Sequence, residues 1–171
     1  RDLLTHTAGI SYGDGPAKDL YKAAGLQGWF MADRPEPIGT YIKKLAGLPF
    51  DAQPGEKWVY GYNTDILGYL VEVVSGMSLA DFIKAKITGP LDIADTSFFQ
   101  PAEKAARMMA VYGANKDGKA ELAADPREYA YVKGPRTCYG GGAGLLSTAE
   151  DYARFLLMLQ SGGEWGGVHI L

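Results

Sequence analysis

The most direct candidate for nucleophilic chemistry in this sequence is Ser11, within Gly-Ile-Ser-Tyr-Gly at residues 9–13. G-x-S-x-G is the nucleophile-elbow pattern, in which a tight turn between a strand and a helix exposes the serine. Here the preceding residues predict a helical turn, and Asp-Gly-Pro at 14–16 follows where a helix should begin. A motif needs its structural context, so the sequence favours a glycine-rich connecting loop over a catalytic Ser11.

Few other side chains are suited to acid–base or metal chemistry. His6 and His169 are the only histidines, and Cys138 is the only cysteine. A Ser-His-Asp arrangement needs a histidine beside a serine, whereas His6 follows an apolar pair and His169 lies in an apolar, strand-like tail. We therefore expect packing or capping roles for both histidines, no zinc site, no other cofactor and no intrachain disulfide.

A second glycine-rich stretch, Tyr-Gly-Gly-Gly-Ala-Gly at residues 139–144, precedes a predicted helix without the lysine of a P-loop. Glycines at such positions indicate close approach of the backbone or positive φ angles. A role in shaping a cleft is an equal alternative, with Gly142 and Gly144 as the candidate residues.

The segment from Pro54 to Gly68 is the most informative part of the chain. A Pro-Gly turn leads into an aromatic-rich, strand-like piece, and Tyr60 then lies in the loop just before a strongly apolar helix. A tyrosine in that place lies near the positive end of the helix dipole. Composition alone favours aromatic core packing here, and a chemical role is the alternative.

The elements that must position these residues are mainly helices. Apolar periodicity predicts helices over about 38–46, 65–75 and 148–160, a short helix over 18–24, and another that begins after Ser78 and ends at Gly89-Pro90. Asn63 or Thr64 is expected to cap the helix at 65, which stops at Gly76. Ser147 and Glu150 predict a capping box for the helix at 148.

The remaining signals are turns and a small amount of β-structure. Strands over about 108–112 and 119–122 flank the turn signal Asn-Lys-Asp-Gly at 115–118. Residues 1–9 predict one helical turn closed by Gly9. The fold class expected from the sequence is α+β, dominated by helices, with a small β-hairpin.

Composition bounds the function without selecting it. The 171 residues suffice for one domain with a sizeable core, and no apolar run approaches the roughly 20 residues that a membrane span needs. The net charge of −3 comes with scattered Lys and Arg, which argues against nucleic acid or an anionic membrane as the main partner. A small-molecule substrate is the remaining expectation.

Three segments in order along the chain resemble those of a known family. These are Arg-Asp-Leu-Leu-Thr-His-Thr-Ala-Gly-Ile at 1–10, the stretch 54–76 around Tyr60, and Gly-Ala-Gly-Leu-Leu-Ser-Thr-Ala-Glu-Asp at 142–151. They are similar to segments of the class C β-lactamase-like serine hydrolases, which include β-lactamases, D-alanyl-D-alanine peptidases and family VIII carboxylesterases. The resemblance implies the helical domain of the β-lactamase/transpeptidase-like fold and identifies Tyr60 as the catalytic tyrosine.

Departures from the family pattern matter for function. Many relatives carry Asn two residues after the tyrosine; this chain has Tyr62 there, and Asn63 follows one position later, as a candidate cleft-shaping residue. Asp65 before Ile-Leu-Gly is more typical of the esterase branch. The family's Ser-x-x-Lys nucleophile motif is absent, and Trp-Gly-Gly at 165–167, a variant of its third motif, lies too close to Tyr60 and predicts a turn.

The resemblance therefore implies that residues 1–171 are a partial domain: the helical lobe with the borders of the α/β lobe, lacking the first and third motifs. The parent would be a serine hydrolase that cleaves an ester or amide bond of a small acyl substrate through an acyl-serine intermediate, whereas the fragment alone would be inactive. We also expect an uncovered apolar face near Leu3, Leu145 and Ile170, or a homodimer that hides it. A non-catalytic penicillin-recognising domain and a free-standing interaction module are the alternatives.

Overall fold

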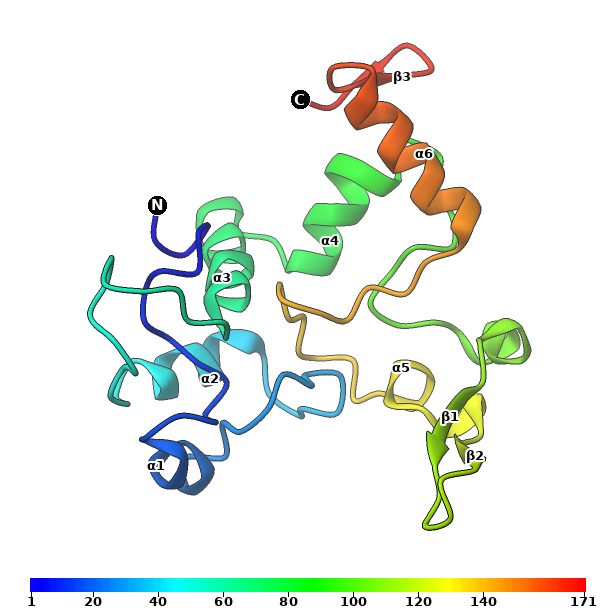
Figure 1. Ribbon diagram of the computed structural model, residues 1–171. Coiled ribbons are helices and arrows are strands. Elements are labelled where there is room, and N and C mark those ends of the chain that lie inside the picture. Colours follow the sequence, from blue (N-terminus) through cyan, green and yellow to red (C-terminus); the bar gives the residue numbers. More distant parts are fainter.

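The computed structural model describes residues 1–171 and shows six α-helices and two small hairpins (Figure 1). The helices are α1 (Lys18–Ala23), α2 (Ile38–Leu45), α3 (Asn63–Ser75), α4 (Leu79–Ile83), α5 (Ala130–Lys133) and α6 (Ala149–Gln160). Antiparallel hairpins are formed by β1 (Val111–Ala114) with β2 (Ala120–Ala124), and by β3 (Glu164–Trp165) with β4 (Val168–His169). The helix-dominated α+β class predicted from the sequence is confirmed.

The main core lies in the N-terminal half, where α2 and α3 pack together. Of the residues predicted to form the apolar face of α2, Ile38 and Leu45 are buried and Ile42 packs against the core, so the face is confirmed; Tyr41 is buried as well. Ten buried residues form this core, and Cys138 joins it from far along the chain. The return of the chain at Cys138 brings the glycine-rich stretch 139–144 beside α3.

Helix α3 begins at Asn63, two residues before the predicted start. The expected cap by Asn63 or Thr64 is wrong: Tyr62 occupies the N-cap position, and no side chain caps the helix. Asn63 is unable to cap because its side chain is buried and bonds to other segments. The predicted stop is confirmed, since Gly76 takes the left-handed conformation with φ 68°.

Capping is correct for α4 and displaced by one residue for α6. The Ser78 hydroxyl accepts a hydrogen bond from the Asp81 amide, as predicted. The helix then widens into a π-helical turn at Lys84–Thr88 before Gly89. At α6 the cap is Thr148, whose hydroxyl accepts from the Asp151 amide, so the predicted Ser147–Glu150 box is wrong by one position.

Both predicted turns that join strands are confirmed. The hairpin of β1 and β2 encloses residues 115–118, although its first strand begins at Val111, not at 108. Gly166 and Gly167, both with positive φ, form the turn of the second hairpin, whereas Trp165 is the last residue of β3. At the N-terminus the predicted turn is present over residues 2–6, but it ends at His6, with φ 55°, rather than at Gly9.

The core cluster of the C-terminal half is smaller than the main core, and α6 extends away from the main core (Figure 1). A small core of Leu91, Ile93 and Met158 holds α6 to the chain that follows the π-turn. Large apolar side chains stay exposed on two helices: Leu70, Val73 and Val74 on α3, and Leu156, Leu157 and Leu159 on α6. No single helix is long and apolar enough to cross a membrane; α3 and Leu79–Thr88 together pass on length and composition, but they are bent by 78°.

Candidate active site

Tyr60 lies three residues before α3 and is 55% exposed. Its ring contacts three other aromatic rings. The distances between ring centroids are 4.9 Å to His6, 5.6 Å to Tyr12 and 5.7 Å to Trp58. The Trp58 ring stacks on Tyr60 with an angle of 18°, whereas Tyr12 meets it edge-on at 79°. The site tyrosine predicted from the sequence is therefore accessible at the approach to α3.

Asn63 joins the N-terminal segment to the segment that carries Tyr60. Its amide nitrogen lies 3.1 Å from Nδ1 of His6 and donates to the carbonyl oxygens of Ile10 and Val59 at 3.3 Å. The side chain is fully buried. Asn63 therefore acts on the surface near Tyr60 only through the segments that it joins.

Asp65, in the first turn of α3, holds the glycine-rich stretch. Its Oδ1 accepts a hydrogen bond from the Gly142 amide at 3.1 Å, and Oδ2 is buried without a partner. Burial of the carboxylate raises the pKa of Asp65 to about 6, and the hydrogen bond from Gly142 opposes this shift. The glycine-rich stretch is thus hydrogen-bonded to a buried carboxylate that has no Lys, Arg or His side chain as an ion-pair partner.

Close approach explains the glycines at 140–142. A Cβ on Gly141 would lie 2.1 Å from the Thr64 carbonyl oxygen, and one on Gly142 would lie 2.7 Å from Oδ2 of Asp65 and 3.0 Å from the Tyr12 hydroxyl. Either side chain would overlap backbone or buried polar atoms. The first alternative for this stretch, close backbone approach, is therefore confirmed; Gly144 adds a positive φ of 123°.

Gly142 and Gly144 also line a cavity of about 480 Å³ between α3, α4 and the glycine-rich stretch. Apolar side chains form most of its wall, among them Leu67, Val71 and Phe98. Tyr60 is not among its lining residues. The cleft-shaping role of the two glycines stays a prediction, now with a defined space beside them.

The remaining nucleophile and histidine candidates are Ser11, Cys138 and His169. Ser11 is buried in an irregular loop, and its hydroxyl accepts a hydrogen bond from the Gly13 amide, which agrees with the connecting-loop interpretation. The thiol of Cys138 is buried, and burial raises its pKa to about 12. His169 lies in β4 of the C-terminal hairpin.

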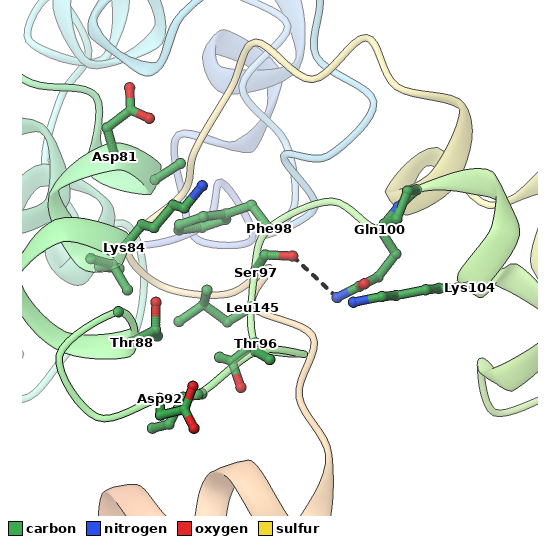
Figure 2. A pocket seen from close by; sticks show the side chains of 16 residues that line it. Asp81, Lys84, Thr88, Asp92, Thr96, Ser97, Phe98, Gln100, Lys104 and Leu145 are labelled. Carbon is green, nitrogen blue, oxygen red and sulfur yellow. Dashed lines mark hydrogen bonds between the residues drawn. The ribbon is translucent and has the colours of Figure 1, made fainter.

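A cavity of about 460 Å³ lies between α4, the π-turn and the chain that follows it (Figure 2). Gln100 is nearly buried in its wall and donates a hydrogen bond to the Ser97 hydroxyl at 3.1 Å. Lys84 and Lys104 are also among the lining residues. None of the residues predicted for the site lines this cavity. No group of three or more His, Cys, Asp or Glu side chains is placed to hold a metal ion.

Comparison with known proteins decides the family. The model of the Beta-lactamase family matches residues 1–166. The chain belongs to the Beta-lactamase family. The resemblance drawn from the three sequence segments is thereby confirmed.

Relatives in this family include enzymes of acyl transfer. Protein Rv1367c of Mycobacterium tuberculosis is 34% identical over 99% of this chain and 40% of its own length. Monacolin J acid methylbutanoyltransferase of Aspergillus terreus is 34% identical over 91% of this chain and 36% of its own length. The chain thus spans about two-fifths of the length of these relatives.

A solved structure confirms the fold. EstCE1, described as a hydrolase with promiscuous acyltransferase activity, superposes with a TM-score of 0.78 at 24% identity, over 99% of this chain and 47% of that chain. The Beta-lactamase family fold predicted from the resemblance is therefore correct.

Sequence reasoning missed three residues of the site. Tyr12 was seen only as part of the elbow pattern, His6 only as a packing residue, and Asp65 only as a sign of the esterase branch. Their distances in sequence from Tyr60 range from five to 54 positions, so local patterns gave no signal for their meeting. The buried charge of Asp65 inside an apolar helix was the one sign that could have indicated a specific partner.

Proposed function

We propose that the chain forms the tyrosine side of the active site of a serine hydrolase, which acts through an acyl-serine intermediate with an ester as the favoured substrate. Tyr60 is the catalytic residue in this proposal. The observation that carries it is the exposed Tyr60 ring, which aromatic contacts hold at the approach to α3 in the segment that resembles the family's tyrosine motif.

Tyr60 would act as a proton carrier. The proposal takes the chain as part of a longer protein that supplies the serine and the lysine of the Ser-x-x-Lys motif. The serine attacks the substrate carbonyl and loses its proton to the pair formed by Tyr60 and that lysine. The acyl-enzyme forms as the alcohol leaves with a proton. Free tyrosine has a pKa near 10 and is a poor base at neutral pH, so the lysine cation is needed to favour the phenolate. The two groups therefore titrate as a pair.

The acyl group then passes to water, which regenerates the serine. A relative at 34% identity is named as a transferase, so an alcohol in place of water is the second acceptor to examine. Both outcomes share the same acyl-enzyme and the same role for Tyr60. They differ only in what enters the site during deacylation.

The test compares three proteins with a p-nitrophenyl ester of a short acid: the longer protein, its Tyr60→Phe variant, and its Tyr112→Phe variant. Tyr112 is also exposed, on β1, and serves as the matched control. Tyr60→Phe should lower the acylation rate at least about a hundredfold, the usual scale for a lost acid–base group, and Tyr112→Phe should leave it unchanged. Equal rates in all three proteins would contradict the proposal.

The 171-residue chain should form no acyl adduct with the same ester, because the nucleophile and its base act as a unit. Intact-mass spectrometry after incubation measures this directly. A stoichiometric adduct on Ser11 would contradict the proposal and restore the nucleophile elbow. A longer protein that binds an acyl compound without turnover would instead favour the non-catalytic, penicillin-recognising alternative.

A further inference from the structure

We propose that His6 and Tyr12 are positioning residues that fix the orientation of the Tyr60 ring. The catalytic consequence rests on the proposed function, but the geometric claim does not. Tyr60 is more than half exposed. Its orientation therefore depends on the rings beside it, and catalysis loses rate steeply when a reacting group is misplaced.

His6 is held in an unusual backbone conformation. Its φ of 55° is in the left-handed region, which is uncommon for a residue other than glycine. The Val59 amide donates to the His6 carbonyl oxygen at 2.8 Å, and Asn63 contacts its ring nitrogen Nδ1. Strained residues persist only where surrounding contacts impose them, and they gather at functional sites. In this backbone conformation the centroid of the imidazole ring lies 4.9 Å from that of the Tyr60 ring.

The Asn63 contact also selects one form of the imidazole. The amide nitrogen of Asn63 lies within hydrogen-bond distance of two carbonyl oxygens as well as Nδ1, so the nitrogen and not the oxygen of the amide faces His6, although its two hydrogens are shared among three acceptors. Nδ1 of His6 must then accept, and in the neutral ring the proton resides on Nε2. The buried amide thus fixes both the plane and the tautomer of the ring beside Tyr60.

Tyr12 also contacts Tyr60 and is itself anchored. Its ring lies edge-on to Tyr60 and also to Tyr62, whose ring centroid is 4.7 Å away. The Tyr62 hydroxyl is directed at the carbonyl oxygens of Leu26 and Gly28, and the Gly28 amide donates to the Tyr12 carbonyl oxygen at 2.9 Å. Tyr12 therefore connects the exposed Tyr60 ring to the main core, against which Tyr12 packs.

Matched substitutions separate ring contact from the other roles of these residues. His6→Asn keeps a residue that tolerates positive φ and can accept from Asn63, but it removes the ring. Tyr12→Leu removes the aromatic edge, whereas Tyr12→Phe keeps it and loses only the hydroxyl. We expect the first two variants to release Tyr60 and the third to leave it in place.

The experiment follows the Tyr60 ring in the 171-residue chain by NMR with ¹³C-labelled tyrosine, assigned with Tyr60→Phe. His6→Asn and Tyr12→Leu should each move the Tyr60 signals toward those of an exposed, unstructured tyrosine, and Tyr12→Phe should not. ¹⁵N spectra of the unmodified chain should show the proton of the neutral His6 ring on Nε2. If either folded variant leaves the Tyr60 signals unchanged, or if the proton is on Nδ1, the proposal is wrong. A variant that loses its fold by circular dichroism is replaced by His6→Gln or Tyr12→Val.

In the longer protein, His6→Asn and Tyr12→Leu should lower the acylation rate about ten- to a hundredfold at unchanged KM, the scale expected for a misplaced reacting group. The two experiments separate the positioning claim from the proposed function. If the Tyr60 signals move in the His6 and Tyr12 variants but Tyr60→Phe acylates at the normal rate, the positioning is supported and the proposed function is wrong. If Tyr60→Phe acylates slowly but the Tyr60 signals do not move in the His6 and Tyr12 variants, the proposed function is supported and the positioning is wrong.

Discussion

The free energy of unfolding of this chain should fall as the pH rises, because Asp65 ionises in the core. Replacing Asp65 by Asn should remove this loss. The carboxylate is almost completely buried, it accepts a hydrogen bond from the Gly142 amide, and no Lys, Arg or His side chain forms an ion pair with it. The titratable groups that face it, Tyr12, Tyr62 and Cys138, have pKa values raised by burial and stay neutral at physiological pH. Ionising Asp65 therefore places an unpaired charge in the core.

The size of the effect follows from the pKa of Asp65, which burial raises from 3.8 to about 6. One pKa unit corresponds to about 1.4 kcal/mol, so linkage gives a contribution of about 3 kcal/mol. The folded state binds the proton more tightly than the unfolded state. The contribution is thus fully present below pH 3.8, declines as the pH rises, and is lost above about 6.

The assay is urea unfolding of the chain and of Asp65→Asn at several pH values between 4 and 7.5, with Asp14→Asn, at an exposed site, as the control. Asn keeps an acceptor for the Gly142 amide and carries no charge. The stability of Asp65→Asn relative to the unmodified chain should increase by up to about 3 kcal/mol across this range, and Asp14→Asn should show no such trend. A relative stability that is flat with pH would refute the reasoning, because Asp65 would then ionise as freely as in the unfolded chain.

Three further outcomes are expected. Gly141→Ala should destabilise the chain by about 1–3 kcal/mol in urea unfolding, because its Cβ would meet the Thr64 carbonyl oxygen, whereas Gly113→Ala has free space and should not. Cys138 should react with a disulfide reagent at pH 8 only as fast as the chain unfolds, since its thiol is buried and its pKa is raised to about 12. Val74→Lys should weaken concentration-dependent self-association measured by analytical ultracentrifugation, because Val74 is 80% exposed on the apolar face of α3; a chain that stays monomeric at high concentration would contradict this expectation.

Elements with strong local signals were predictable from the sequence. The apolar stripe of α2, the Ser78 cap and the left-handed Gly76 each depend on residues within one or two turns of the chain, and each is present. The predicted caps of α3 and α6 were wrong because more than one polar residue lies at the start of each helix. Tertiary contacts, such as the burial of Asn63, then decided which residue took the cap position.

The candidate site was predictable only at Tyr60. Its place before an apolar helix is a local property, and the resemblance gave it a role. The rings of His6 and Tyr12, which contact it, come from the first segment of the chain, about 50 residues away. Non-local contacts of this kind have no periodicity in the sequence, so pattern reasoning had no means to find them.

Two buried acceptors in the first turn of α3 have no hydrogen-bond partner among the protein atoms. Oδ1 of Asn63 and Oδ2 of Asp65 are buried without a hydrogen-bond partner, and both lie within five residues of Tyr60. Leaving such an atom unpaired costs about 1–3 kcal/mol, and more for a charged group. The same two side chains, through Nδ2 and Oδ1, fix the N-terminal segment and the glycine-rich stretch against α3. A core optimised for stability would fill these positions with apolar residues, so the cost is consistent with a turn that keeps the surroundings of Tyr60 in one arrangement.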